Sequence, residues 1–288
     1  MQRKLHPLEG IVAAFALFFA LALTVGFAQA DEIKKQKAVF LRSSSALVLD
    51  AATGEAVIDK NSDVIVPIAS ITKLMTAMVI LDRGLDLETK IVLSKDDVRT
   101  IKRSRTRLRT GASLSRDELL MLSLMASENL AAAALARTYP GGIDAFVEAM
   151  NVKAAQLGMR DSHFVEPTGL SPENVSSAQD LARLVRAANE YPLIRAYSTR
   201  ERGTVTVFKR QLSFGNTNNL VRNSHWDIEL SKTGYISQAG RCLVMRVNLA
   251  SKDLIVVLLD SWGKHSRVGD ANRIKKWLES NLSRAHSS

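Results

Sequence analysis

The feature that most constrains this chain is a run from Leu74 to Leu81 that is apolar on every side. A helix without a polar face must be surrounded by other elements, and Asp82-Arg83-Gly84 provides a stop signal after it. The run therefore predicts a buried helix around which the rest of the chain packs. Ser70 and Lys73 stand immediately before it. Residues three apart share a helix face, so their hydroxyl and amine should point the same way at the first turn.

A hydroxyl beside an amine is one way to activate a nucleophile, and the positive end of a helix favours an anionic oxygen there. Alone, the Ser-x-x-Lys pattern is common, and Ser261-Trp262-Gly263-Lys264 is a second copy. The second copy contains a glycine and follows a strand-like run, whereas the first copy opens an apolar helix. This context favours Ser70 and Lys73 for catalysis.

The first 30 residues have the pattern of an export signal. Arg3 and Lys4 precede an apolar stretch from Ile11 to Phe27, and Ala28-Gln29-Ala30 offers small residues before Asp31. This pattern predicts a cleavable secretory signal and a mature chain that begins at Asp31. The alternative is an uncleaved anchor, because roughly 17 apolar residues are marginally long enough to span a bilayer.

The whole chain has a formal net charge of +10, and the leader holds Arg3, Lys4 and Glu9, a net +1, so the mature chain carries +9. Such a charge favours polyanions, which for an exported protein means the cell envelope and not nucleic acid. The basic residues between Arg99 and Arg109 form either a solvated face or a rim that attracts an anionic wall polymer. Cys242 is the single cysteine, which excludes an internal disulfide, and its apolar neighbours predict a buried strand position.

Strand patterns at both ends of the mature chain flank a helical middle. Strands are expected at 45–49, 55–58, 204–208, 228–234, 241–249 and 254–259. Helices are expected at 114–138, with an interruption at 127–129, and at 142–157, 177–190 and about 274–278. Ser115 and Glu118 have the spacing of a capping box. The short spacing of the late strands implies antiparallel pairing, so we expect an α+β protein and not a doubly wound nucleotide fold.

Two further motifs follow Ser70 and Lys73 along the chain. Ser127-Glu128-Asn129 is the only Ser-x-Asn sequence, and Lys232-Thr233-Gly234 is the only Lys-Thr-Gly sequence. Each could be structural by itself, as polar groups at a helix end or a lysine at a strand edge. Together, in this order, they match the pattern of penicillin-interacting serine enzymes, so we interpret them as catalytic.

On these motifs the sequence resembles the low-molecular-mass penicillin-binding proteins, which are serine D-alanyl-D-alanine peptidases, over essentially all of Ser44 to Leu278. The loop from Phe164 to Leu170 is similar to one that flanks the family's active site, and the stretch from Gln211 to Tyr235 is similar to the endopeptidases of the family. The resemblance implies a β-lactamase/transpeptidase-like fold, an antiparallel sheet flanked by helices. The catalytic domain would be residues 31–288, with an inserted helical lobe at roughly 84–190.

The resemblance also implies a role for each motif residue. Ser70 would attack a D-alanyl carbonyl and form an acyl-enzyme, Lys73 would be the base, and Ser127 would pass a proton to the leaving amine. The substrate would be bound by Asn129, Lys232, Thr233 and Gly234. The backbone N–H groups of Ser70 and Tyr235 would form the oxyanion hole. Burial and the charge of Lys232 should bring the pKa of Lys73 from about 10.4 to about 7.

The implied activity is a periplasmic endopeptidase that hydrolyses the peptide cross-links of peptidoglycan and is inhibited covalently by penicillin and other β-lactams. A D-alanyl-D-alanine carboxypeptidase is the first alternative, because the same motifs serve both reactions. A serine β-lactamase is a second, although Glu166 is expected to be a structural loop residue and not a deacylation base. A noncatalytic wall-binding module is a third.

No cofactor is expected, and His163, His225 and His265 lack the spacing of metal ligands. The larger carboxypeptidases of the family carry a further C-terminal β domain and a membrane-surface helix. Because this sequence ends soon after Trp277 and Leu278, we expect no stable membrane anchor once the signal is removed. Nucleic acid is not an expected partner.

Overall fold

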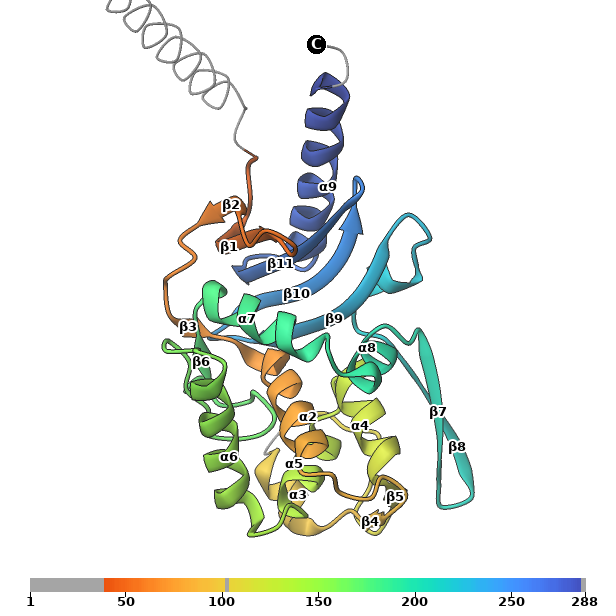
Figure 1. Cartoon of the computed structure of the whole chain (residues 1–288). Helices are drawn as coiled ribbons and strands as arrows, with labels where there is room; N and C mark the ends of the chain where they lie inside the picture. The colour runs from red at the N-terminus through yellow and green to blue at the C-terminus, as the bar shows by residue number, and fades with distance from the viewer. Residues whose placement is uncertain (1–38, 102–103, 286–288) are drawn as a thin grey trace, which may run out of the picture. The chain divides into compact units, whose positions relative to one another are not determined.

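One layer of the structure is an antiparallel sheet of five strands in the order β2-β1-β11-β10-β9 (Figure 1). The strands are β1 (Ser43–Asp50), β2 (Ala56–Lys60), β9 (Asp227–Ile236), β10 (Gly240–Leu249) and β11 (Lys252–Ser261). The computed structural model describes residues 39–101 and 104–285, so the expected signal at 1–30 lies outside the described residues. The described elements belong to the unit Leu41–Glu279, except for the end of the last helix beyond Glu279.

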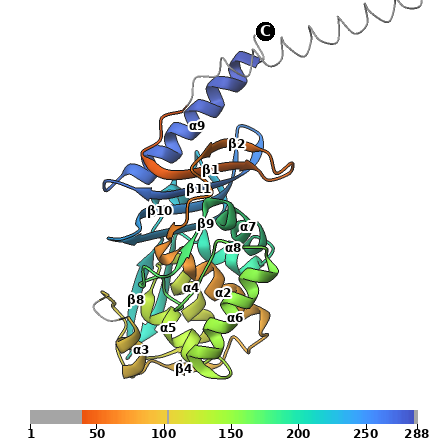
Figure 2. The same cartoon turned by 90° about the vertical axis from the view of Figure 1, so that its left-hand side faces the viewer.

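Helices cover both faces of this sheet (Figures 1 and 2). Helix α9 (Ser266–Ala285) lies on one face, and its Ile274 and Leu278 are buried. The opposite face is covered by α7 (Ala178–Ala188) and the other helices, with Leu47 and Val257 in the same core cluster as the helix residues. Because strand side chains alternate between faces, the apolar late strands can serve two cores at once.

Helix α2 (Thr72–Asp82) is the predicted central helix, and every residue from Thr72 to Ile80 is buried. It contacts five other helices on the same side of the sheet. Those helices are α4 (Arg116–Met125), α5 (Asn129–Arg137), α6 (Gly142–Gln156), α7 and α8 (Pro192–Ser198). The prediction of a buried central helix is confirmed.

The expected helix at 114–138 is two helices, α4 and α5. Ser115 caps α4 in the predicted capping box with Glu118. The chain turns at Ser127, whose φ of 56° is left-handed and cannot continue a helix, and Glu128 then caps α5. The polar interruption in the sequence is therefore a sharp corner between two buried helices.

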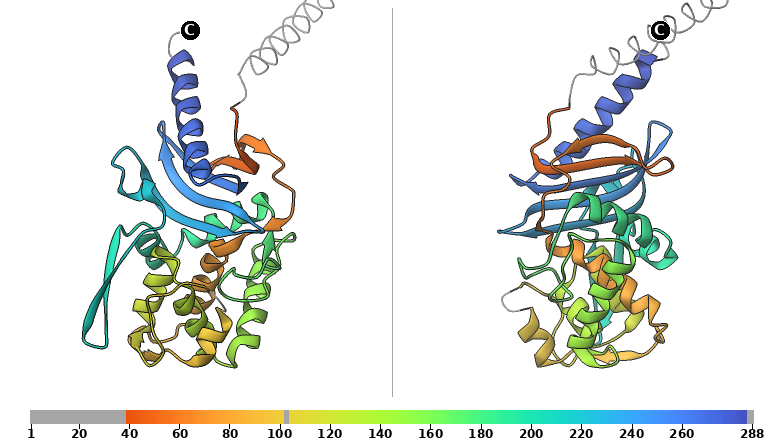
Figure 3. Two further views of the ribbon diagram at one scale, coloured as in Figure 1. Left: turned by 180° about the vertical axis from the view of Figure 1, so that it is seen from behind. Right: turned by 60° about the vertical axis from the view of Figure 1, so that its left-hand side comes forward.

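Three pairs of short strands lie outside the main sheet. They are β3 (Val66–Pro67) with β6 (Val175–Ser176), β4 (Lys90–Val92) with β5 (Ser113–Ser115), and β7 (Arg202–Val207) with β8 (Arg210–Gly215). The β7–β8 hairpin lies along the side of the helical layer (Figure 3). Short helices complete the chain: η1 (Ala69–Ile71), α3 (Lys95–Thr100) and η2 (Asn219–Arg222). Within the described residues, no helix is both long enough and apolar enough to cross a bilayer.

Candidate active site

Ser70 lies in the short helix η1, directly before α2, and Lys73 lies in the first turn of α2. The Lys73 side chain is fully buried, and its Nζ donates to Ser70 Oγ at 3.0 Å. Two further acceptors hold this amine, Asn129 Oδ1 at 2.6 Å and the Thr168 carbonyl at 2.5 Å. The expectation that Ser70 and Lys73 point the same way is confirmed, and the amine is held by three fixed oxygens.

The second motif stands at the corner between α4 and α5. Ser127, held in its left-handed conformation, accepts a hydrogen bond from Lys232 Nζ at 2.9 Å. Asn129 begins α5, and its amide nitrogen donates to Ser104 Oγ at 2.5 Å. Asn129 therefore uses its oxygen for Lys73 and its nitrogen for Ser104.

The third motif lies on β9, the free edge of the main sheet. Lys232 is buried, and Nζ also donates to the Thr233 carbonyl at 3.0 Å. A Cβ added to Gly234 would lie 2.9 Å from the Ile68 carbonyl oxygen and 3.1 Å from the Ser70 nitrogen. Glycine is therefore required where β9 packs on η1, which is a reason for Gly234 beyond the expected approach of a peptide. Tyr235 follows, with its side chain exposed.

The three motifs thus form two lysine–serine pairs, Lys73 with Ser70 and Lys232 with Ser127. Burial lowers the pKa of Lys73 to about 8, while the carboxylates of Glu166 and Glu128 oppose this shift. Burial and then the charge of Lys73 lower the pKa of Lys232 well below its ordinary value. Both amines thus lose part of their preference for the charged state.

Glu166 shapes the loop beside Lys73. Its carboxylate accepts from the backbone N–H groups of Thr168 at 2.7 Å and Gly169 at 2.5 Å, and from the side chains of Thr168 and Asn174. These bonds match the structural role expected for it. They also place the Thr168 carbonyl against the Lys73 amine. Gly169 is needed here, because its φ is 79° and an added Cβ would lie 1.9 Å from the Ala69 carbonyl oxygen.

The stretch from Gln211 to Tyr235 was singled out only as a whole, by resemblance, and the structure shows which of its residues contact the motifs. Thr217 Oγ1 accepts from Thr233 Oγ1 at 2.6 Å, and it stands between two buried asparagines, Asn216 and Asn218. Asn216 donates to the carbonyls of Ser198 and Arg200, and Asn218 donates to Ser231 Oγ. The sequence signal that could have identified Thr217 is its position between two asparagines, Asn216 and Asn218, whose side chains are buried while that of Thr217 is exposed. It is weak without knowledge of which strand lies alongside.

The basic segment from Arg99 to Arg109 is partly attached to the site. Ser104 accepts from Asn129, and Arg107 donates to the Ser213 carbonyl at 2.5 Å with its guanidinium 4.9 Å from the Phe214 ring centre. Arg105 and Arg109 remain exposed. The described part of the segment is therefore more than a solvated face, although most of its charge still faces water.

The second Ser-x-x-Lys copy does not form a comparable pair. Ser261 is buried at the end of β11, where its hydroxyl is 2.5 Å from Ser43 Oγ and belongs to a network with Asp270. Lys264 is exposed. Among the described residues there is no group of three or more His, Cys, Asp or Glu side chains that could hold a metal ion.

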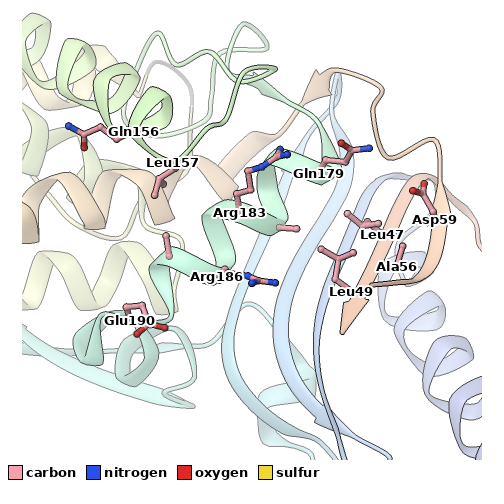
Figure 4. Close-up of a pocket in the computed structure, with 12 residues that line it drawn as sticks. Leu47, Leu49, Ala56, Asp59, Gln156, Leu157, Gln179, Arg183, Arg186 and Glu190 are labelled. Atoms are coloured by element: carbon pink, nitrogen blue, oxygen red, sulfur yellow. The ribbon is translucent and has the colours of Figure 1, made fainter. Parts of the chain in front are cut away.

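The largest of the described cavities lies away from the three sequence motifs. It has a volume of about 890 Å³ and lies between β1, β2, α6 and α7 (Figure 4). Leu47, Leu49 and Ala56 form part of its apolar wall, while Arg183 and Arg186 project from α7. No motif residue is among the residues that line it, so cavity size alone would not have located the lysine–serine pairs.

Comparisons with known proteins place this geometry in context. A family model described as D-alanyl-D-alanine carboxypeptidase, Peptidase_S11, matches residues 32–263. The chain is 48% identical over 242 residues to a D-alanyl-D-alanine endopeptidase of Pseudomonas aeruginosa, with 83% of this chain and 78% of that protein covered. It is 43% identical over 275 residues to a D-alanyl-D-alanine endopeptidase of Escherichia coli K12, with 93% and 88% covered.

More distant relatives bear other names. A D-alanyl-D-alanine carboxypeptidase of Bacillus subtilis is 30% identical over 267 residues, with 90% of this chain and 66% of that protein covered. Among solved structures, the Streptomyces K15 DD-transpeptidase superposes with a TM-score of 0.78 at 26% identity, covering 85% of this chain and 99% of that one.

Proposed function

This chain belongs to peptidase family S11, the D-alanyl-D-alanine carboxypeptidases, and we propose that it is a serine D-alanyl-D-alanine endopeptidase that hydrolyses peptidoglycan cross-links. The observation that carries the proposal is the double pairing of buried amines with hydroxyls, Lys73 with Ser70 and Lys232 with Ser127. A protein that only binds the wall gains nothing from burying two lysines beside two serines, because burial of each amine opposes its charge.

In the proposed reaction the neutral Lys73 amine takes the Ser70 hydroxyl proton while Ser70 Oγ attacks the D-alanyl carbonyl. The backbone N–H groups of Ser70 and Tyr235 stabilise the oxyanion of the tetrahedral intermediate. The close approach of Gly234 to the Ser70 nitrogen supports this pairing, because Tyr235 is the next residue. The carbon–nitrogen bond then breaks, the proton returns to the leaving amine by way of Ser127, and water hydrolyses the resulting Ser70 ester.

The leaving-group side is proposed to lie at Lys232 and Thr233, which would hold the carboxylate of the departing residue while Asn129 orients the substrate amide. The hydrogen bond between Thr217 and Thr233 supports this, because it makes the loop after β8 a wall of the same site. Gly234 lets the peptide approach β9. We therefore assign the stretch from Asn216 to Trp226 to recognition of the second peptide stem.

The endopeptidase assignment is preferred to the carboxypeptidase alternative because the relatives at 48% and 43% identity are named endopeptidases, whereas a carboxypeptidase relative reaches 30%. The β-lactamase alternative is less favoured, because the Glu166 carboxylate is occupied by hydrogen bonds within its own loop. The catalytic domain is proposed to be residues 31–288, with the helical lobe at roughly 84–190.

We also propose that the chain is exported and acts in the periplasm, with a mature N-terminus at Asp31. The pattern at 1–30 supports export. β-Lactams are the proposed covalent inhibitors, acylating Ser70. An intact mass of periplasmic protein that retains residues 1–30 would contradict the export proposal.

Labelling with benzylpenicillin tests the nucleophile. Mature protein should gain one adduct on the Ser70 peptide, Ser70→Ala should gain none, and Ser251→Ala, at the exposed turn between β10 and β11, should behave as wild type. An adduct on another residue would make the assignment of Ser70 wrong.

Competition between two muropeptide substrates tests the reaction type. Mature enzyme incubated with purified cross-linked dimer and with monomeric pentapeptide should release monomer from the dimer faster than D-alanine from the pentapeptide. The reverse order would favour the carboxypeptidase.

A further inference from the structure

A partly buried arginine, Arg267, contacts the strand of the third motif from the far face of the sheet. It lies in the first turn of α9, whereas Ser70 and Lys73 belong to the helical layer on the opposite face (Figures 1 and 2). Its Nη1 donates to the Gly234 carbonyl at 2.9 Å and to the Cys242 carbonyl at 3.4 Å. Arg267 therefore binds the backbone of the motif strand without lying on the side of the sheet where Ser70 lies.

These two hydrogen bonds show which way the peptide group between Gly234 and Tyr235 points. Gly234 is paired with Cys242 across β9 and β10. One nitrogen can reach both carbonyl oxygens only if both point into the space between the two strands, as in a hydrogen-bonded antiparallel pair. The peptide bond is trans, so the Tyr235 N–H points the opposite way, out of the free edge of β9. The carbonyl that binds Arg267 and the N–H assigned to the oxyanion hole are thus two ends of one peptide group.

The charge of Arg267 has no carboxylate partner in the described part of the chain. Its hydrogen bonds go to the two carbonyls, and its pKa is lowered first by burial and then by the charge of Arg241. By contrast, Arg273 on the same helix forms an ion pair with Asp270. A cation held only by neutral carbonyl dipoles keeps most of its field for a negative charge that forms nearby.

A hydrogen bond to one end of a peptide group strengthens the donor at its other end. Chains of hydrogen bonds polarise one another, by about 10–30% per bond, and a charged donor such as a guanidinium forms a stronger bond than a neutral one. The bond from Arg267 therefore makes the Tyr235 N–H a better donor. An oxyanion exists only while Ser70 attacks, so a stronger donor lowers the energy of the transition state more than that of the bound substrate.

We propose that Arg267 is a positioning residue of the oxyanion hole. It holds the peptide group between Gly234 and Tyr235 with its N–H directed out of the sheet edge, and it strengthens that N–H as a donor to the oxyanion. Arg267 acts through the backbone of β9, contacts no substrate atom and transfers no proton. This inference rests on the proposed function and adds a residue of α9 to the groups that promote acylation of Ser70.

The rate of Ser70 acylation by benzylpenicillin tests the proposal. Arg267→Met keeps an apolar stem but removes the donor and the charge, so the second-order rate should fall about 10- to 100-fold, less than for outright loss of an oxyanion donor. The pH at which the rate levels off should not move, because Arg267 is not among the charges that act on the pKa of Lys73. Lys264→Met, an exposed cation just before α9, is the matched control and should acylate as wild type.

A vibrational measurement separates this role from a structural one and from the effect of Arg267 on the pKa of Lys232. In the acyl-enzyme the ester carbonyl on Ser70 lies in the oxyanion hole, and its stretching band falls in wavenumber as its hydrogen bonds strengthen. With benzylpenicillin isotope-labelled at the β-lactam carbonyl, the infrared band of Arg267→Met should lie at higher wavenumber than that of wild type. The band of Lys264→Met should match wild type.

Separate results identify which proposal fails. Wild type that gains no adduct on Ser70 would overturn the proposed function. Wild type that is labelled, together with an unshifted carbonyl band or a wild-type acylation rate in Arg267→Met, would overturn the positioning role and leave the proposed function intact. Should Arg267→Met fail to fold, Arg267→Gln, whose shorter amide carries no charge, has the same expected slower rate and higher wavenumber.

Discussion

At the scale of single residues, burial is the largest cause of the lowered pKa of both active-site lysines. The sequence predicted that burial and the charge of Lys232 would lower the pKa of Lys73. Burial is indeed the largest cause, but the charges that act on Lys73 are those of Glu166 and Glu128, and they raise its pKa. The charge of Lys73 in turn lowers the pKa of Lys232. Lys73 is therefore left with a pKa of about 8, near the pH at which a general base works well.

This pKa makes acylation of Ser70 dependent on pH. A base must be neutral, so the rate of benzylpenicillin acylation should rise about tenfold per pH unit below the pKa and level off above about 8. Lys73→Arg keeps the charge but cannot lose its proton, so it should fold and acylate at least ~10²-fold more slowly, without the inflection. Near-normal rates in this variant would show that Lys73 acts only through its charge.

A substitution at Glu128 should change the pH at which the acylation rate levels off. It is buried at the start of α5, and its carboxylate raises the pKa of Lys73. In Glu128→Gln the amide oxygen can still accept from Leu130 N–H while the charge is lost, so the inflection should move to a lower pH, by roughly half a unit or more. The exposed Glu201→Gln is the control. An unmoved inflection in Glu128→Gln would exclude electrostatic control by this residue.

At the scale of elements, the site depends on three segments packed against η1: the loop after α6, the strand β9 and the helix α2. Two of these contacts require glycine. Gly234 lets β9 approach η1, and Gly169 lets the loop that carries the Thr168 carbonyl approach Ala69. The backbone contact at Gly169 therefore sets how closely the Thr168 carbonyl approaches the Lys73 amine.

Two glycine substitutions separate this contact from simple backbone strain. Gly169→Ala adds a Cβ 1.9 Å from the Ala69 carbonyl oxygen at a φ of 79°, so the free energy of unfolding should fall by about 2–4 kcal/mol, and acylation should slow. Gly84→Ala has a φ of 64° and no atom within 4 Å, so it should lose only about 1 kcal/mol and keep its acylation rate. Urea unfolding measures both. Equal losses would mean that the close approach is unimportant.

At the scale of the whole molecule, the predicted α+β fold of the β-lactamase/transpeptidase type is confirmed by the antiparallel sheet and by the likeness to the Streptomyces K15 DD-transpeptidase. The net positive charge is a second whole-molecule property. It acts at long range on a polyanionic wall much more strongly than on a small inhibitor that carries a single negative charge.

Salt should therefore separate wall binding from chemistry. Raising the salt from 0.05 to 0.5 M shortens the screening length severalfold, so binding to insoluble peptidoglycan should weaken by about tenfold or more. Benzylpenicillin acylation, measured in the same buffers, should change less than about twofold. Wall binding that resists salt would assign the affinity to specific contacts instead of net charge.

Much of this protein could be predicted from local sequence. The apolar run from Leu74 to Leu81 specified the central helix, because a helix without a polar face can only be buried. Short turns between late strands specified antiparallel pairing. The order of the three motifs identified the family, which the comparisons confirm. These properties depend on residue type and spacing, which a sequence carries directly.

Only the tertiary structure could show the properties of the site that depend on residues far apart in the chain. The acceptors around Lys73 and the contact between Thr217 and Thr233 each join segments whose proximity no local pattern encodes. A small pocket at the β9–β10 turn likewise brings Tyr235 and Arg241 together with Ser261 and Lys264 of the second Ser-x-x-Lys copy. Burial and charge proximity are properties of packed surfaces, so the pKa of each lysine followed from the fold and not from its motif.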